Sequence, residues 1–185
     1  SFTDEPDTIY DGNQTAGFLA RADWQARFLE TLTPHLEGID GIELDFLNMP
    51  NSAQRDLTRL VSAIDVAIRP THRLGIFVPP SIAYPSDLPG GDAISRLDVA
   101  PHVDRLRIMT LDYSDNYLTP GPTIEPGWAV DALRFASTAS SNIDISYPLY
   151  GNDFGARGLR GVSYAEAVAT GSRVEAGTAP VAARK

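Results

Sequence analysis

Short apolar segments alternate with segments of helical period along this 185-residue sequence, and that order constrains the fold more than any other feature. Apolar residues spaced three and four apart predict amphipathic helices. These helices are expected over residues 23–36, 51–68, 93–100, 127–138 and 164–170. Between them, the apolar runs "GIDGIELDF", "RLGIFVPPS", "VDRLRIMTLDY" and "IDISYPLYG" predict strands. A repeated strand–helix order predicts an α/β fold with a parallel sheet and covering helices.

Two architectures fit this order: a (β/α)8 barrel and an open, doubly wound sheet. No G-x-G-x-x-G or Walker loop is present, so nothing supports a nucleotide-binding version. The predicted strands end in polar loops that contain Gly or Pro, and such loops build the active site of a barrel. Asn51 or Ser52 is expected to cap the helix after the first strand, and Ser163 the last helix. We expect one domain over residues 1–171 and a loosely ordered tail over residues 172–185.

Composition excludes several classes of function. The net charge is −9, which argues against a nucleic acid or an anionic membrane as the main partner, because both attract Lys and Arg. The sequence has 0 cysteines, which excludes disulfides, thiolate catalysis and Cys-based zinc sites. No apolar run approaches the roughly 20 residues that a membrane helix needs. The three histidines have no metal-ligand spacing, so neither a metal nor another cofactor is expected.

The stretch "DGIELDFLNMP", residues 40–50, combines a strand pattern with acidic residues. Strand alternation places Glu43, Asp45 and Leu47 on one face. Two readings are open at this point: an ordinary buried strand whose acids are satisfied by hydrogen bonds, or the end of a strand in an active site. Buried carboxylates are costly without a reason, which favours the site.

Four motifs in order change that balance: "GIDGIELDF", "RIMTLDYS", "TPGPTIEPGW" and "ISYPLYGNDF". Together they resemble glycoside hydrolase family 18, in particular its bacterial cell-wall and spore-cortex branch. There, a D-G-x-D-x-D-x-E strand is followed by M-T-Y-D-Y, a Gly-Pro loop before a helix with a Trp, and P-x-Y-G. The resemblance spans about residues 38–169. It implies a (β/α)8 barrel, substrate-assisted cleavage of N-acetylglucosamine polymers, and action outside the cell or at the cell envelope.

Carried over to this sequence, the resemblance implies a partly intact site. Asp40 matches the first Asp of the acidic motif, Glu43 stands at the middle Asp, and Asp45 matches the Asp that orients the substrate acetamide. Leu47 occupies the position of the catalytic Glu.

The second motif departs in the same way. Met109 and Asp112 match it, but Leu111 stands where the acetamide-binding Tyr is found. Tyr113, Tyr147 and Tyr150 are expected to line the sugar cleft.

Leucine has no proton to donate, and general acid catalysis is typically worth about 10²–10⁴-fold. We therefore expect a domain that binds N-acetylglucosamine-containing glycans, such as chitin or peptidoglycan, and has lost hydrolysis. Two alternatives stay open. In the first, the chain is an active glycosidase whose general acid has moved to Glu43, Asp112 or Asp115. In the second, it is a scaffold that binds a protein instead of a sugar.

The barrel is expected to be incomplete or shortened, because about 250 residues are usual and only four strands are convincing. The family's strands 1–2 and 8 have no clear counterpart, although a strand at or before "SFTDEP" is possible. No Trp follows Trp128, so we expect this sequence to lack the Trp sugar platform that the last strand carries in the family it resembles. Tyr84, Tyr113, Tyr117 and Tyr150 fall in or beside the predicted mouth loops, where rings suit stacking on sugars.

Overall fold

The centre of the molecule is a four-stranded parallel sheet in which neighbours in space are also neighbours in sequence. In spatial order the strands are β1 (Gly41–Leu44), β2 (Arg73–Val78), β3 (Arg105–Ile108) and β4 (Ile143–Ile145). The computed structural model describes residues 11–86, 88, 90–114, 120–153 and 160–169. The possible strand near "SFTDEP" and the predicted tail lie outside these residues.

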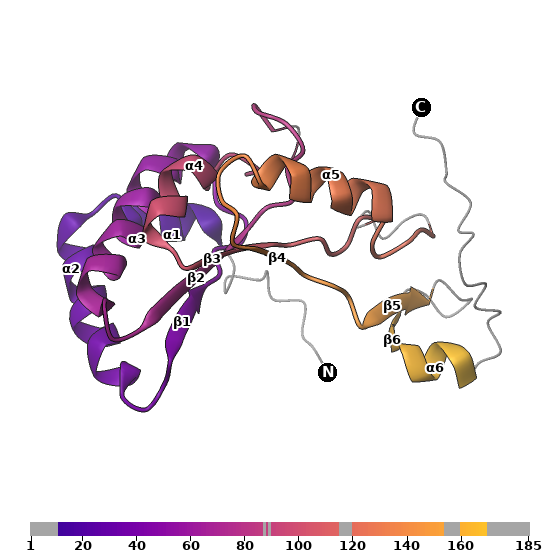
Figure 1. Ribbon diagram of the computed structural model, residues 1–185, viewed down its shortest axis with the longest axis horizontal. Coiled ribbons are helices and arrows are strands. Elements are labelled where there is room, and N and C mark those ends of the chain that lie inside the picture. Colours follow the sequence, from indigo (N-terminus) through magenta and orange to yellow (C-terminus); the bar gives the residue numbers. More distant parts are fainter. Residues whose placement is uncertain (1–10, 87, 89, 115–119, 154–159, 170–185) are drawn as a thin grey trace.

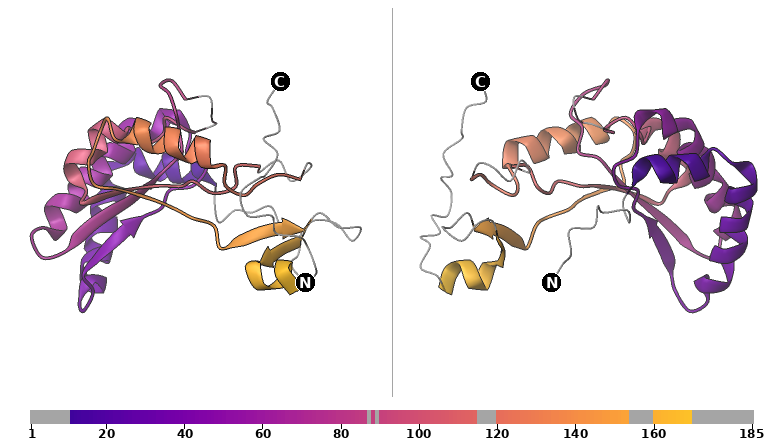
Figure 2. Two further views of the ribbon diagram at one scale, coloured as in Figure 1. Left: turned by 45° about the vertical axis from the view of Figure 1, so that its right-hand side comes forward. Right: turned by 180° about the vertical axis from the view of Figure 1, so that it is seen from behind.

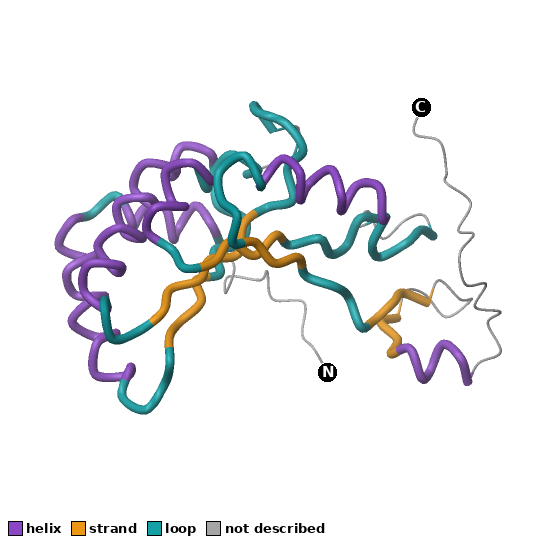
Figure 3. The backbone as a smooth tube through the Cα atoms, viewed as in Figure 1, coloured by secondary structure: helices purple, strands orange, loops and turns teal. Residues whose placement is uncertain are grey.

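The helices that precede and connect the strands gather on one side of the sheet (Figures 1 and 3). They are α1 (Gly12–Leu19), α2 (Ala22–Leu32), α3 (Gln54–Ile68), α4 (Arg96–Val99) and α5 (Pro126–Ala136), with the 3-10 turns η2 (Thr33–Leu36), η3 (Asn51–Ala53) and η4 (Ala100–His102). The two further views in Figure 2 show the same one-sided arrangement. A doubly wound sheet carries helices on both faces, so the described part of the chain has the barrel-type arrangement, although its sheet is open.

The apolar core lies between the helices and the sheet. Every second residue of β2 and β3 is fully buried, for example Leu74 and Ile76, and these side chains meet the apolar stripe of α3. The stripe is the one that the helical period predicts: Leu57, Leu60, Val61, Ile64 and Ile68. Burial of such side chains contributes roughly 1.5–3 kcal/mol each, which explains why α3 forms without a side-chain cap.

The opposite face of the sheet carries charges instead of an apolar core. The Arg107 guanidinium donates to the carboxylate of Glu43, and it also lies 3.5 Å from Asp144. Arg105 approaches the same Asp144 carboxylate at 2.8 Å, and the Arg107 cation lies 5.2 Å from the ring centre of Phe77. The side chains of Glu43 and Arg107 are 29% and 32% exposed, so this network is neither buried nor fully solvated.

A second, two-stranded antiparallel sheet follows β4 and was not expected from the sequence. It consists of β5 (Tyr150–Asp153) and β6 (Arg160–Ser163), and α6 (Tyr164–Ala169) follows it. The prediction of one strand over "IDISYPLYG" is therefore wrong, because the main-sheet strand ends at Ile145 and Tyr150 begins another sheet. Ser163 caps α6 as predicted: its Oγ accepts from the Glu166 N–H at 3.2 Å, while the Glu166 carboxylate accepts from the Ser163 N–H.

Three local expectations need correction. No helix was expected before residue 23, but α1 forms there, and Asp11 caps it by accepting from the Asn13 and Gln14 N–H groups. The helix expected over residues 93–100 is limited to α4 and η4. Neither Asn51 nor Ser52 caps α3; the Asn51 side chain instead accepts from the Asp92 N–H at 3.2 Å, which ties two loops together.

None of the helices that the structure describes is both long and apolar enough to cross a membrane.

Candidate functional site

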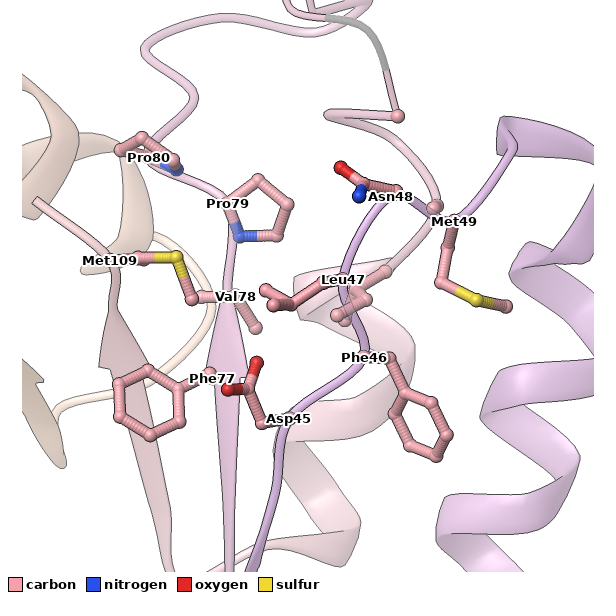
Figure 4. A pocket seen from close by; sticks show the side chains of 13 residues that line it. Asp45, Phe46, Leu47, Asn48, Met49, Phe77, Val78, Pro79, Pro80 and Met109 are labelled. Atoms are coloured by element: carbon pink, nitrogen blue, oxygen red, sulfur yellow. The ribbon is translucent and has the colours of Figure 1, made fainter. Parts of the chain in front are cut away.

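A pocket of about 170 Å³ opens where β1 and β2 end, at the carboxyl edge of the sheet (Figure 4). Parallel strands bring their following loops together at this edge, which is why ligands bind there in α/β folds. The walls come from the loop after β1, the end of β2, the connection between β2 and α4, and the residue after β3. They consist of Asp45, Phe46, Leu47, Asn48, Met49, Phe77, Val78, Pro79, Pro80, Gly90, Ala93, Ile94 and Met109. Asp45 is the one titratable side chain in this lining.

Asp45 directly follows β1, and its carboxylate points into the pocket between Leu47 and Phe77 (Figure 4). Phe46 points to the other side of the chain. Partial burial among apolar groups raises the pKa of Asp45 above its ordinary value, because the apolar surroundings penalise the charged form.

Leu47 lies on the same side of the chain as Asp45, and its side chain extends toward Val78 and Pro79 (Figure 4). After it the chain turns, because Asn48 adopts a left-handed conformation with φ 55° and Met49 is buried. Asn48 tolerates this region better than most residues. The turn places Leu47 at the pocket wall, opposite the end of β2.

The predicted site residues do not all come together. Asp45, Leu47 and Met109 line the pocket. Glu43 lies deeper, on the charged sheet face beside Arg107, and Asp40 precedes β1 at the far end of the strand.

The second predicted group surrounds the end of β3 and the start of β5. Asp112 has φ 54° and accepts a hydrogen bond of 2.7 Å from the Tyr150 hydroxyl. Tyr113 packs against Trp128 with ring centres 5.1 Å apart. Tyr147 is 69% exposed and precedes the second sheet. None of these four predicted residues is among those that line the pocket.

Several pocket residues were missed. The loop that begins at Pro79 was expected at the mouth from its place after a strand, but Gly90, Ala93 and Ile94 were not. Ala93 and Ile94 lie where a helix was predicted and Gly90 just before it, and their contact with the pocket depends on how the connection folds back toward the sheet. Asp115, one of the proposed substitute acids, lies outside the described residues. Among those described, no group of three His, Asp or Glu side chains is placed to hold a metal ion.

Comparison with known proteins identifies the fold. No family model and no curated protein matches the sequence. The structure resembles YdhD of Bacillus subtilis, assigned as a sporulation-specific glycosylase, with a TM-score of 0.80 and 17% identity over 88% of this chain and 57% of that one. It also resembles the spore cortex-lytic enzyme SleL of Bacillus cereus, with a TM-score of 0.78 and 20% identity over 90% of this chain and 41% of that one. A chitinase of Chromobacterium violaceum is similar as well, with a TM-score of 0.73 and 19% identity over 80% of this chain and 49% of that one.

The chain therefore spans about half the length of the solved structures that it matches. The predicted resemblance to glycoside hydrolase family 18 is confirmed at the level of the fold: this chain has the α/β architecture of spore-cortex and chitinase-type enzymes, with four strands of the barrel described.

Proposed function

We propose that this chain binds N-acetylglucosamine-containing glycans, such as chitin or peptidoglycan, in the pocket above β1 and β2 and does not hydrolyse them. The observation that carries this proposal is the pairing of Asp45 with Leu47 on one side of the chain, in a pocket at the carboxyl edge of the sheet. The fold shared with proteins named as chitinases and cortex-lytic enzymes supports the choice of ligand.

The lining suits an acetamido group. A carboxylate accepts the amide N–H of such a group, and the methyl group and the C–H faces of a sugar find apolar partners in Leu47, Phe77 and Pro79. The Asp45 carboxylate can make a charge-assisted hydrogen bond, which is stronger than a hydrogen bond between two neutral groups. We therefore assign acetamide recognition to Asp45.

Hydrolysis needs a second titratable group beside the one that orients the acetamide, because the leaving oxygen must receive a proton. Leu47 cannot supply it, and among the described residues that line the pocket Asp45 is the only acid. Glu43 accepts from Arg107 on the sheet face below, and Asp112 accepts from Tyr150 outside the pocket. These contacts argue against Glu43 and Asp112 as the relocated acid.

The site of action that we propose is the cell envelope or the exterior, where such polymers occur. Proteins named for the spore cortex and spore coat among the structural neighbours support this assignment.

The test compares the unaltered chain with the double variant Leu47→Glu, Leu111→Tyr, using N-acetylglucosamine oligomers. Binding is measured by calorimetry and cleavage by chromatography of the products. We expect binding without cleavage by the unaltered chain, and cleavage by the double variant at least about 10²-fold above the matched control Leu47→Gln, Leu111→Tyr. The control has a side chain of the same length but no proton to donate.

Asp45→Ala should abolish binding in every background. Cleavage by the unaltered chain would support the active-enzyme alternative, and absence of binding by the unaltered chain would support the scaffold alternative.

A further inference from the structure

The connection between β2 and α4 forms an arch whose two ends are walls of the pocket. Pro79 and Pro80 at its start, and Gly90, Ala93 and Ile94 at its end, all line the pocket. Figure 4 shows the chain rising above the pocket after Pro80, and at the other end of the connection Gly90 lies against the Met49 carbonyl. In Figure 1 the same segment projects away from the body of the molecule. A ligand that leaves the pocket on this side therefore meets the arch next.

Hydrogen bonds of buried side chains hold the inside of the arch. Ser81 is 1% exposed, and its hydroxyl oxygen lies within hydrogen-bond distance of the Ser86 hydroxyl, at 2.9 Å, and of the Gly91 carbonyl, at 3.3 Å. The Ser86 N–H in turn donates to the Asp92 carboxylate at 2.9 Å. These bonds cross from the rising to the returning limb, so the arch has a fixed width.

Further bonds tie the arch to the helices below it. The Gln54 amide, in the first turn of α3, donates to the Asp92 carbonyl at 2.6 Å, and Asn51 accepts from the Asp92 N–H. On the other limb, the buried Arg96 guanidinium donates to the Pro79 carbonyl and lies 5.2 Å from the ring centre of Phe135 on α5.

Gly90 makes the return possible. Its φ is +68°, and a Cβ at this position would lie 2.4 Å from the Met49 carbonyl oxygen. Only glycine allows the arch to come this close to the loop after β1. The returning end of the arch is thus fixed against the loop that carries Asp45 and Leu47.

The outside of this anchored arch is apolar. Ile82 is 46% exposed, Tyr84 is 74% exposed and Leu88 is 36% exposed. Loop tips usually carry small or polar residues, so three exposed large apolar side chains in one short connection need an explanation, and a binding surface is the usual one. The tyrosine ring adds a flat apolar face with a polar tip, which suits the C–H face and hydroxyl groups of a sugar.

We propose that the arch is an outer saccharide-binding platform, in which Tyr84 contacts a sugar unit of the glycan beyond the unit held in the pocket. This inference rests on the proposed function, because the occupant is the same polymer continuing out of the same pocket. Its consequence is a preference for longer oligomers. A disaccharide fills the pocket only, whereas a hexasaccharide reaches Tyr84 as well.

The experiment measures the affinity of the full chain for the disaccharide and the hexasaccharide of N-acetylglucosamine by calorimetry. Tyr84→Ala should weaken hexasaccharide binding about three- to tenfold, as expected for the loss of one stacked ring, and leave disaccharide binding unchanged. Tyr84→Phe should keep the affinity for both, because it keeps the ring. The matched control is Tyr164→Ala, since Tyr164 on α6 is 68% exposed and takes no part in the pocket.

Three results would overturn the inference. Equal loss for both oligomers in Tyr84→Ala would mean that the arch only shapes the pocket. Equal affinity of Tyr84→Ala and the unaltered chain for the hexasaccharide would mean that Tyr84 makes no sugar contact. No binding of either oligomer by the unaltered chain would remove the proposed function and the platform together, so the two failures are distinguishable.

Discussion

Asp45 concentrates the chemistry of this site in one side chain. It follows the strand β1, and it projects into a pocket with apolar walls. The other carboxylate on this side of the strand, that of Glu43, accepts from Arg107 instead. The surroundings raise the pKa of Asp45, since they favour the neutral acid over the carboxylate. The residue is therefore held at a cost to the fold, which is a common property of binding and catalytic groups.

This cost predicts a pH dependence of stability. The contribution of a group whose folded pKa is raised is fully present below its unfolded pKa, about pH 4 for aspartate, and is lost as the pH rises through the folded pKa. Asp45→Asn cannot ionise, so it should be more stable than the unaltered chain at pH 7, by a margin that falls toward zero below about pH 4. Thermal unfolding at both pH values measures the margin, and a margin that stays constant between them would refute the assignment.

The arch shows how a structural element is positioned by residues far from it in sequence. Gln54 and Asn51 hold its returning limb, and Arg96 holds its rising limb. Its position against the loop after β1 depends on one glycine with a left-handed backbone.

Gly90→Ala should therefore destabilise the protein by about 1–3 kcal/mol, the usual cost of a residue forced into a left-handed conformation. Urea unfolding measures the change. Gly17→Ala is the matched control, because Gly17 lies inside α1 and a Cβ there would meet nothing within 4 Å. That substitution should stabilise the protein by about 0.5–1 kcal/mol. Similar effects of the two substitutions would mean that the arch is not fixed at Gly90.

Elements with a strong local signal could be predicted, and those that depend on distant contacts could not. The stripe of α3 and the capping serine of α6 are visible in the sequence because they rest on residues three or four apart. The helix α1 has few apolar residues and one capping aspartate, so its pattern is weak. The break between β4 and β5 has no strong local signal either, because Tyr147 and Tyr150 continue a strand-like alternation across it.

The residues of the candidate site also fall into those that local pattern predicts and those that depend on distant contacts. Asp45 and Leu47 share a side of the chain because strand alternation requires it, whereas the contact of Gly90 and Ile94 with the same pocket follows from the return of the arch. The pairing of Glu43 with Arg107 was missed for a related reason. Alternation indicates that both face one side of the sheet, but only the strand order brings them together.

As a whole, the described part of the molecule is a parallel sheet with an apolar face toward the helices and a charged face on the other side. Arg107 joins the strands of this charged face, because it contacts Glu43 from β1, Phe77 from β2 and Asp144 from β4. This network of ion pairs adds less to the free energy of unfolding than buried pairs would, because its side chains are about one third exposed to solvent.

Arg107→Met should lower the free energy of unfolding by about 1–2 kcal/mol at low salt, the range for hydrogen bonds to charged groups after allowance for solvent. The deficit should shrink in about 1 M NaCl, where the screening length falls to roughly 3 Å. Arg134→Met is the control, because Arg134 on α5 forms an exposed pair with Asp131. A deficit that does not respond to salt would indicate lost packing on Phe77 instead of lost ion pairs.

We propose that the pocket over Asp45 binds an N-acetylglucosamine glycan and leaves it intact. The decisive experiment is a crystal structure of the unaltered chain with the hexasaccharide of N-acetylglucosamine. We expect an uncleaved oligomer with one acetamido group hydrogen-bonded to the Asp45 carboxylate, its methyl group against Leu47, and a further sugar unit on Tyr84. A cleaved oligomer, or an intact one bound away from Asp45, would contradict it.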